Sequence, residues 1–254
     1  MKPQIRQQQI LDRLRAVPQE WRIDQLARDL RVSSLTIRRD LEELEKNGAV
    51  VRTVGGCLAV WRIHHADYQA RVSHNFAAKR AIGHAALEEV HAGDVLLIND
   101  GSTTYHLASC LAAVGGLTVY TNSVAMIGEL RRCADLKLYI MGGEYDERLA
   151  SMGGALLQDA LAKVMADTVF LGVDVIDERG RCLTADQETA HTAALMLRHA
   201  RRKILLADHT KVALRGGVVY AKLSDFDLWI TTKGMPSGVL RGFRRQTKIK
   251  EVQK

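Results

Sequence analysis

From residue 77 onward, short apolar runs alternate with helical patterns, and this alternation limits the possible folds more than any other feature of the chain. Strands that alternate with helices of this length usually pair in parallel through crossover connections. The pattern therefore predicts an α/β domain with a mostly parallel, doubly wound sheet over residues 77–235. The expected strands are Val95 to Ile98, Leu117 to Tyr120, Leu136 to Met141, Thr168 to Val173, Lys203 to Ala207 and, as the last one, Trp229 to Thr232.

Small or polar residues follow these apolar runs directly. Because open α/β sheets bind ligands at the carboxyl ends of their strands, we expect five such loops to converge on one crevice. The loops carry Asp100-Gly101-Ser102-Thr103-Thr104, Thr121-Asn122-Ser123, Gly142-Gly143, Asp174 and Asp208.

The first of these loops has the chemistry of a phosphate site. Its backbone N–H groups and hydroxyls can surround an anion at the positive end of the helix that follows, although a plain strand-to-helix turn with a Ser or Thr cap fits as well. The next two loops offer side-chain donors and close backbone approach. The carboxylates of Asp174, Glu188 and Asp208 can accept hydrogen bonds from the hydroxyl groups of a sugar, and Lys211 can pair with the charge of the ligand. Each of these residues could instead be a helix cap or a solvated charge. We expect a phosphorylated sugar as ligand, no cofactor, no metal ligand and no catalytic residue.

The N-terminal residues 1–60 show a different pattern. Three helices are predicted, over residues 4–16, Ile23 to Leu30, and a stretch that begins after the cap residue Ser33. Val50 to Arg52 and Leu58 to Val60 can pair across Gly55-Gly56 as a wing, with Gly48 as the preceding helix stop. This is typical of a winged helix-turn-helix, although an ordinary helical hairpin has similar spacing.

The second helix of this motif presents polar side chains away from its buried stripe. Ile37, Leu41 and Leu44 recur at helical spacing and should face the core. The residues expected to contact DNA lie on the other side of the helix and on the wing, and they are Ser34, Thr36, Arg38, Arg39, Arg52 and Thr53.

Charge is unevenly distributed along the chain. Residues 1–62 hold 12 Lys and Arg against 8 Asp and Glu, and residues 233–254 hold 7 against 1, so the middle of this +7 chain is mildly acidic. Basic ends suit binding to a phosphate backbone, but a basic tail is often only solvated. We interpret 61–76 as a linker and 236–254 as a disordered basic tail.

The cysteine spacing and the N-terminal sequence indicate the cellular compartment in which the protein is expected. Cys57, Cys110, Cys133 and Cys182 form no C-x-x-C pair, and the adjacent His64 and His65 diverge too much to favour a metal site. No apolar segment reaches membrane-spanning length, and the N-terminus does not resemble a signal peptide. We expect a cytoplasmic protein with reduced thiols.

A family resemblance follows from these residues. The run Thr36-Ile37-Arg38-Arg39-Asp40-Leu41, with Gly48, Arg52 and Gly55-Gly56, resembles the winged helix-turn-helix of the DeoR family of bacterial transcriptional regulators. Leu117-Thr118-Val119, Gly142-Gly143-Glu144, Phe170-Leu171-Gly172, and Asp208 with Lys211 resemble the effector domain of that family, whose fold is similar to ribose-5-phosphate isomerase. Asn99 stands where the family commonly has Asp.

The resemblance implies a DNA-binding regulator, usually a repressor of a sugar-catabolic operon, whose binding to double-stranded operator DNA is altered by a phosphorylated sugar. Since helix-turn-helix proteins generally pair to match two half-sites, we expect a homodimer or homotetramer. The alternative is a sugar-phosphate isomerase with an accessory DNA-binding domain. Such an enzyme needs a tuned general base, for which Glu188 and Asp174 are the candidates, and it would leave the helix-turn-helix unexplained.

Overall fold

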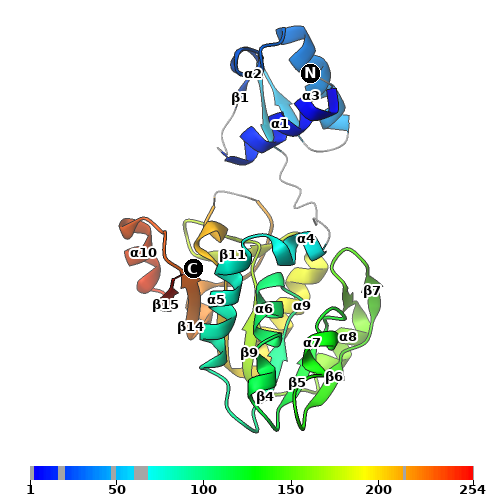
Figure 1. The fold of residues 1–254 in the computed structure, drawn as a ribbon, viewed down its shortest axis with the longest axis vertical. Helices are drawn as coiled ribbons and strands as arrows, with labels where there is room; N and C mark the ends of the chain where they lie inside the picture. Colours follow the sequence, from blue (N-terminus) through cyan, green and yellow to red (C-terminus); the bar gives the residue numbers. More distant parts are fainter. Residues whose placement is uncertain (1–2, 17–20, 47–49, 60–67, 214–215, 254) are drawn as a thin grey trace. The chain divides into compact units, whose positions relative to one another are not determined.

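A computed structural model describes residues 3–16, 21–46, 50–59, 68–213 and 216–253. The chain divides into two compact units, residues 1–64 and residues 65–254 (Figure 1). Among the helices of the described ranges, none is both long and apolar enough to cross a membrane.

The first unit is a three-helix domain with a small antiparallel sheet. Its helices are α1 (Pro3–Ala16), α2 (Ile23–Leu30) and α3 (Ser34–Lys46), and its strands are β1 (Trp21–Arg22), β2 (Val50–Thr53) and β3 (Gly56–Ala59) in the order β1-β3-β2. The predicted apolar stripes meet in one core, where Ile10, Leu26, Ile37 and Leu41 are fully buried. The winged helix-turn-helix is therefore present, with β1 as an added strand.

The turn between α2 and α3 depends on two residues. Arg31 adopts the left-handed conformation, with φ 54°, and ends α2. The Ser33 hydroxyl accepts a hydrogen bond from the Thr36 backbone N–H at 3.2 Å, which is the predicted cap of α3.

Gly55, with φ 98°, provides the turn of the wing. The predicted helix stop at Gly48 lies outside the described residues.

The second unit contains a seven-stranded, all-parallel sheet in the order β15-β14-β12-β9-β4-β5-β6, which confirms the predicted fold class. Its strands are β4 (Val95–Ile98), β5 (Thr118–Thr121), β6 (Lys137–Ile140), β9 (Ala166–Leu171), β12 (Ala200–Leu206), β14 (Leu228–Thr232) and β15 (Lys248–Val252).

Helices cover both faces of this sheet, because alternate strand residues point to opposite sides. On β4, Leu96 and Ile98 pack in the cluster that contains α5 (Phe76–Leu87), α6 (Ser102–Ala108) and α7 (Ile127–Leu130). Leu97 packs in the other cluster, with α8 (Ala155–Leu161), α9 (Gln187–Arg198) and α10 (Ser237–Arg244). Short 3₁₀ helices complete the unit at Leu111–Ala113 (η1), His209–Lys211 (η2) and Leu223–Asp225 (η3).

Two small antiparallel sheets were not predicted. One is the hairpin of β7 (Glu144–Asp146) and β8 (Ser151–Gly153), and the other joins β10 (Val175–Ile176), β11 (Arg181–Thr184) and β13 (Val218–Lys222). Apart from β13, these strands have two to four residues and lack the four-residue apolar run that marks β4.

The prediction of a disordered tail over residues 236–254 is wrong. Residues 237–252 form α10 and β15 instead, and β15 pairs in parallel with β14. Phe243 is 2% exposed and packs against Trp229, with ring centroids 5.9 Å apart. Burial of this aromatic pair orders the segment despite its positive charge.

The expected linker also differs from the structure. Residues 60–67 lie outside the described residues, but α4 (Tyr68–Ser73) is ordered and belongs to the second unit. Tyr68 is 2% exposed, and its ring meets that of Tyr105 of α6 edge-on. A short helix with one aromatic anchor gave no periodicity from which this packing could be read.

Candidate functional sites

The exposed face of α3 carries the predicted DNA-contacting residues. Arg38 and Arg39 are both exposed, whereas Ile37 and Leu41 on the opposite face are fully buried. Ser34 and Thr36 are partly exposed near the start of the helix, and the Ser34 hydroxyl donates to Asp24 of α2 at 3.0 Å. The two arginines are therefore presented to solvent, as a helix that reads a DNA groove requires.

The predicted wing residues have a second role in the structure. Arg52 of β2 forms ion pairs with Glu42 at 2.8 Å and with Glu45 at 3.2 Å, both on α3. Its backbone N–H also donates to Glu45. Thr53 is partly exposed at the end of the same strand. Arg52 thus links the wing to the helix that carries Arg38 and Arg39.

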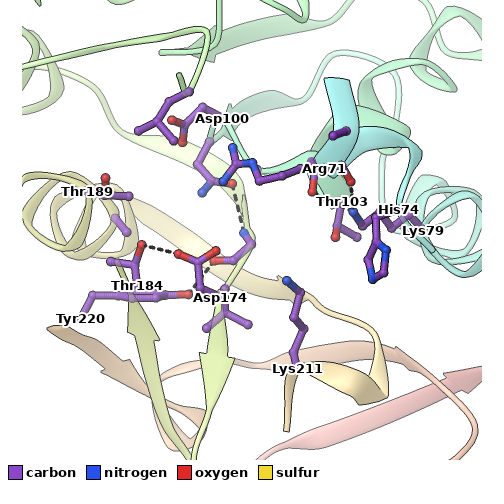
Figure 2. Close-up of a pocket in the computed structure, with 18 residues that line it drawn as sticks. Arg71, His74, Lys79, Asp100, Thr103, Asp174, Thr184, Thr189, Lys211 and Tyr220 are labelled. Carbon is purple, nitrogen blue, oxygen red and sulfur yellow. Dashed lines mark hydrogen bonds between the residues drawn. The ribbon is translucent and has the colours of Figure 1, made fainter. Parts of the chain in front are cut away.

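A cavity of about 330 Å³ lies at the carboxyl ends of the sheet strands in the second unit (Figure 2). Six predicted ligand residues line it, and they come from three separate segments of the chain. They are Asp100, Gly101, Ser102, Thr103, Asp174 and Lys211.

Cationic groups from three elements line this first cavity. Arg71 reaches toward Asp100 from α4, and Lys211 of η2 points into the same space (Figure 2). Lys79 of α5 donates to the Ser102 hydroxyl at 2.9 Å and to the backbone carbonyl of Arg71. Burial lowers the pKa of Lys79 to about 8, and the charges of Lys211 and Arg71 act in the same direction. Such a cluster favours an anionic ligand that compensates these charges.

The sequence pattern missed Arg71, His74 and Lys79 as cavity residues. The sequence pattern predicts Arg71 as part of a linker and Lys79 as one residue of an ordinary helix. The Nε atom of Arg71 is buried and has no hydrogen-bond partner among the described residues. An unpaired buried donor is costly, so a ligand acceptor at this position would stabilise the site.

Asn99 and Asp100 directly follow strand β4 and have different roles. Asn99 uses its Oδ1 to accept from the Gly172 backbone N–H at 3.0 Å. Asp100 is 7% exposed and lines the cavity. Burial raises its pKa, while the Ser151 hydroxyl and the charge of Arg71 act to lower it. Of these two neighbours, Asp100 therefore brings a carboxylate to the cavity, and Asn99 fixes the loop.

A second cavity, of about 530 Å³, adjoins the first. Asn99, Asp100, Leu149, Thr189 and Ala193 line both. The predicted residues Asn122 and Glu188 belong to the second cavity, as does much of the β7–β8 hairpin. The Glu188 carboxylate accepts from the Gly154 backbone N–H at 2.7 Å, so it also fixes the start of α8.

The remaining predicted ligand residues line neither cavity. Thr104 and Thr121 are fully buried and hold their own loops, since the Thr104 hydroxyl donates to the Asn99 carbonyl and the Thr121 hydroxyl accepts from the Ser123 N–H. Gly143 allows close approach of the hairpin, because an added Cβ would lie 2.0 Å from the Gly153 carbonyl oxygen. The other three are Ser123, Gly142 and Asp208.

Asp208 does not line the first cavity but interacts electrostatically with two residues that do, Lys79 and Lys211. It is 1% exposed, and it accepts hydrogen bonds from the backbone N–H and the hydroxyl of Thr210. Burial acts to raise its pKa, but the Thr210 hydrogen bonds and the charges of Lys211 and Lys79 lower it overall. Asp208 is therefore a counter-charge to two of the cavity cations.

The described residues contain no group of three His, Cys, Asp or Glu side chains able to hold a metal ion. His64 and His65 lie outside those residues. Cys110, Cys133 and Cys182 are free thiols, and burial raises the pKa of each.

Two family models match this chain. The model described as DeoR C terminal sensor domain matches residues 74–233, and the one described as DeoR-like helix-turn-helix domain matches residues 6–61. The first match alone spans more than half of the chain.

Several curated proteins are similar over most of their length. The HTH-type transcriptional regulator GlpR of Haloferax volcanii is 31% identical over 82% of this chain and 82% of its own. The transcriptional repressor AccR of Agrobacterium fabrum is 32% identical over 91% and 90%, and the HTH-type transcriptional repressor GlcR of Bacillus subtilis is 31% identical over 83% and 81%. Among solved structures, a D-ribose-5-phosphate isomerase with phospho-erythronic acid is 15% identical over 53% of each chain, with a TM-score of 0.39.

Proposed function

The chain belongs to the DeoR family of transcriptional regulators, and from this we propose that it represses a sugar-catabolic operon and senses a phosphorylated sugar. It is a DNA-binding regulator with a sensor domain. The observation that carries the sensor half of the proposal is the cluster of Arg71, Lys79 and Lys211 around one cavity.

The DNA-binding half rests on the exposed face of α3. Arg38 and Arg39 are exposed on a helix whose other face is fully buried in the core. Guanidinium groups bind guanine edges bidentately and also contact phosphates, so this face suits a DNA groove. Two half-sites require two copies of the unit, and we propose a homodimer or a homotetramer.

The effector half rests on charge and shape. Three cations with one buried unpaired donor attract a phosphate, and the Ser102 and Thr103 hydroxyls lie at the same cavity. Asp100 and Asp174 can accept from sugar hydroxyls. The Asp174 carboxylate already accepts from the Thr184 hydroxyl at 2.9 Å, which orients it.

The position of Arg71 in the chain supports a route for regulation. Arg71 belongs to α4, the first described element after residues 60–67, which join the second unit to the first. A ligand that draws the Arg71 side chain toward its phosphate would act directly on the helix next to that connection. Differential contact of this kind is what shifts an equilibrium between two states.

The proposal is tested by a genome-fragment binding selection with the full-length protein, repeated with a panel of phosphorylated sugars. We expect enrichment of one operator class, and release of that DNA by one member of the panel. The variant Arg38→Ala/Arg39→Ala should lose the enrichment but still bind the sugar phosphate. NMR of the recovered sugar separates a sensor from an enzyme. Turnover of the sugar, or DNA binding with no sequence preference, would contradict the proposal.

A further inference from the structure

The second cavity differs in charge from the first. Its lining includes the carboxylates of Glu144, Glu147, Asp186 and Glu188. Its Arg148 is already paired with Asp146, at 2.8 Å and 3.2 Å. The described residues that line this cavity therefore offer no unpaired cation.

Acidic residues alone do not make a binding site, but this cavity also has buried polar atoms without partners. Asn122 is 3% exposed, and its Oδ1 atom has no hydrogen-bond partner among the described residues. Thr192 is 5% exposed, and its hydroxyl also has no hydrogen-bond partner among the described residues. Both residues line the cavity. Buried polar groups are normally satisfied, so these two indicate a ligand group that hydrogen bonds there.

The two cavities meet at Asp100. This residue lines both, with Arg71 on the side of the first cavity and Ser151 on the side of the second. A ligand whose phosphate lies among Arg71, Lys79 and Lys211 would therefore extend past Asp100 toward Asn122.

We propose that the two cavities form one site for a sugar monophosphate, in which the second cavity binds the hydroxyl-bearing end and rejects a second anion. This inference rests on the proposed binding of phosphate in the first cavity. A hydroxyl donates to the Asn122 Oδ1 atom and to nearby carboxylates, whereas a second phosphate or a carboxylate meets mainly like charge, because the lining cation Arg148 is already paired with Asp146. Sugar bisphosphates and phosphorylated sugar acids are thus excluded by the same groups that accept the sugar hydroxyls.

Matched ligand pairs test this proposal by calorimetry on the full-length protein. The pairs are glucose 6-phosphate with 6-phosphogluconate, fructose 6-phosphate with fructose 1,6-bisphosphate, and ribulose 5-phosphate with ribulose 1,5-bisphosphate. In every pair in which the monophosphate binds, we expect the second anion to weaken binding by about tenfold or more. Equal or tighter binding of the doubly charged member would overturn the inference and leave the phosphate sensor intact. If no member of any pair binds, the proposed sensor function itself fails.

Variants of the hairpin provide the second test. The side chains of Glu144 and Glu147 are exposed and make no hydrogen bond or ion pair among the described residues, so Glu144→Gln/Glu147→Gln removes charge without breaking a side-chain contact. The double variant should reduce the discrimination against the second anion by several-fold. Glu178→Gln, which removes an exposed carboxylate outside both cavities, should leave it unchanged. Unaltered discrimination in the hairpin variant would mean that the acidic lining does not select the ligand.

Discussion

Arg6 of α1 and Asp40 of α3 form a buried, two-pronged ion pair inside the DNA-binding unit. The guanidinium Nε atom contacts Asp40 Oδ2, and Nη2 donates to Oδ1 at 3.0 Å, with side chains 10% and 4% exposed. Asp40 directly follows Arg38 and Arg39, so this pair fixes the helix that presents them. It connects residues 34 positions apart in the chain.

We expect Asp40→Ala to destabilise the first unit by about 3–5 kcal/mol, because it leaves the charge of Arg6 buried without its partner. Arg6→Met and Asp40→Leu should each cost more than the double variant Arg6→Met/Asp40→Leu, since only the double variant leaves no buried charge. Urea denaturation of the single and double variants gives the coupling energy. Additive single effects would show that the two charges do not depend on each other.

Arg38→Ala and Arg39→Ala should each weaken operator binding. An arginine that reads a base should cost about 1–3 kcal/mol and relax the sequence preference, whereas a phosphate contact should lower the salt slope by about one. Titrations at several salt concentrations distinguish the two roles. Arg201→Ala, an exposed arginine of the second unit, is the control. Normal affinity in both helix variants would remove α3 from the DNA interface.

Arg52 should contact the DNA backbone only after it leaves Glu42. We expect Arg52→Ala to lower affinity for all sequences with little loss of discrimination. Glu42→Gln should raise affinity modestly by removing one of the two ion-pair partners of Arg52 and a negative charge from α3. In the Arg52→Ala background only the second effect remains, so the gain should be smaller. A gain of the same size in both backgrounds would show that the ion pair does not restrain Arg52.

Effector binding should weaken as the pH rises through the pKa of Lys79, about 8. Below this pH Lys79 is charged and attracts phosphate, and above it the first cavity loses a cation. A bound phosphate raises the pKa of Lys79 again, so binding near pH 8.5 should take up a proton. Calorimetry in buffers of different ionisation enthalpy measures that uptake. The Lys79→Met variant should bind the effector more weakly and take up fewer protons on binding. Equal proton uptake by this variant would show that a group other than Lys79 takes up the proton.

Gly101→Val should reduce the response to effector while leaving DNA binding largely unchanged. An added Cβ would lie 3.0 Å from the Thr104 hydroxyl and 3.2 Å from Asn99 Oδ1, so the loop beside the first cavity must shift. Operator release by the effector is the measurement. Gly128→Val, with open space around its Cβ position, is the matched control. Normal release in the Gly101 variant would place the ligand away from this loop.

A fragment that begins at Phe76 should bind the effector more weakly than the full-length chain. Such a fragment lacks α4 and with it Arg71, which lines the first cavity. The full-length chain is therefore the appropriate material for each binding experiment.

The sequence by itself determined the elements whose side chains repeat with a clear period. The stripes of α2 and α3 predicted the helix-turn-helix, and the apolar runs ending at Ile98 and Thr232 predicted strands of a parallel sheet. Polar residues at strand ends predicted Asp100 to Thr103, Asp174 and Lys211 as cavity residues, because the carboxyl ends of parallel strands share one edge. These inferences need only local pattern and the topology that it implies.

Only the tertiary structure decided which of these polar groups share a cavity and which support their own loops. Thr104 and Thr121 have the same chemistry as Ser102 and Thr103, but their hydroxyls bond within the loop. Arg71 and Lys79 reach the first cavity from helices whose sequence shows only ordinary charges. The ordered C-terminus likewise depends on the contact of Phe243 with Trp229. The loop contacts depend on the exact backbone geometry, and the others depend on packing between separate elements, and local periodicity encodes neither.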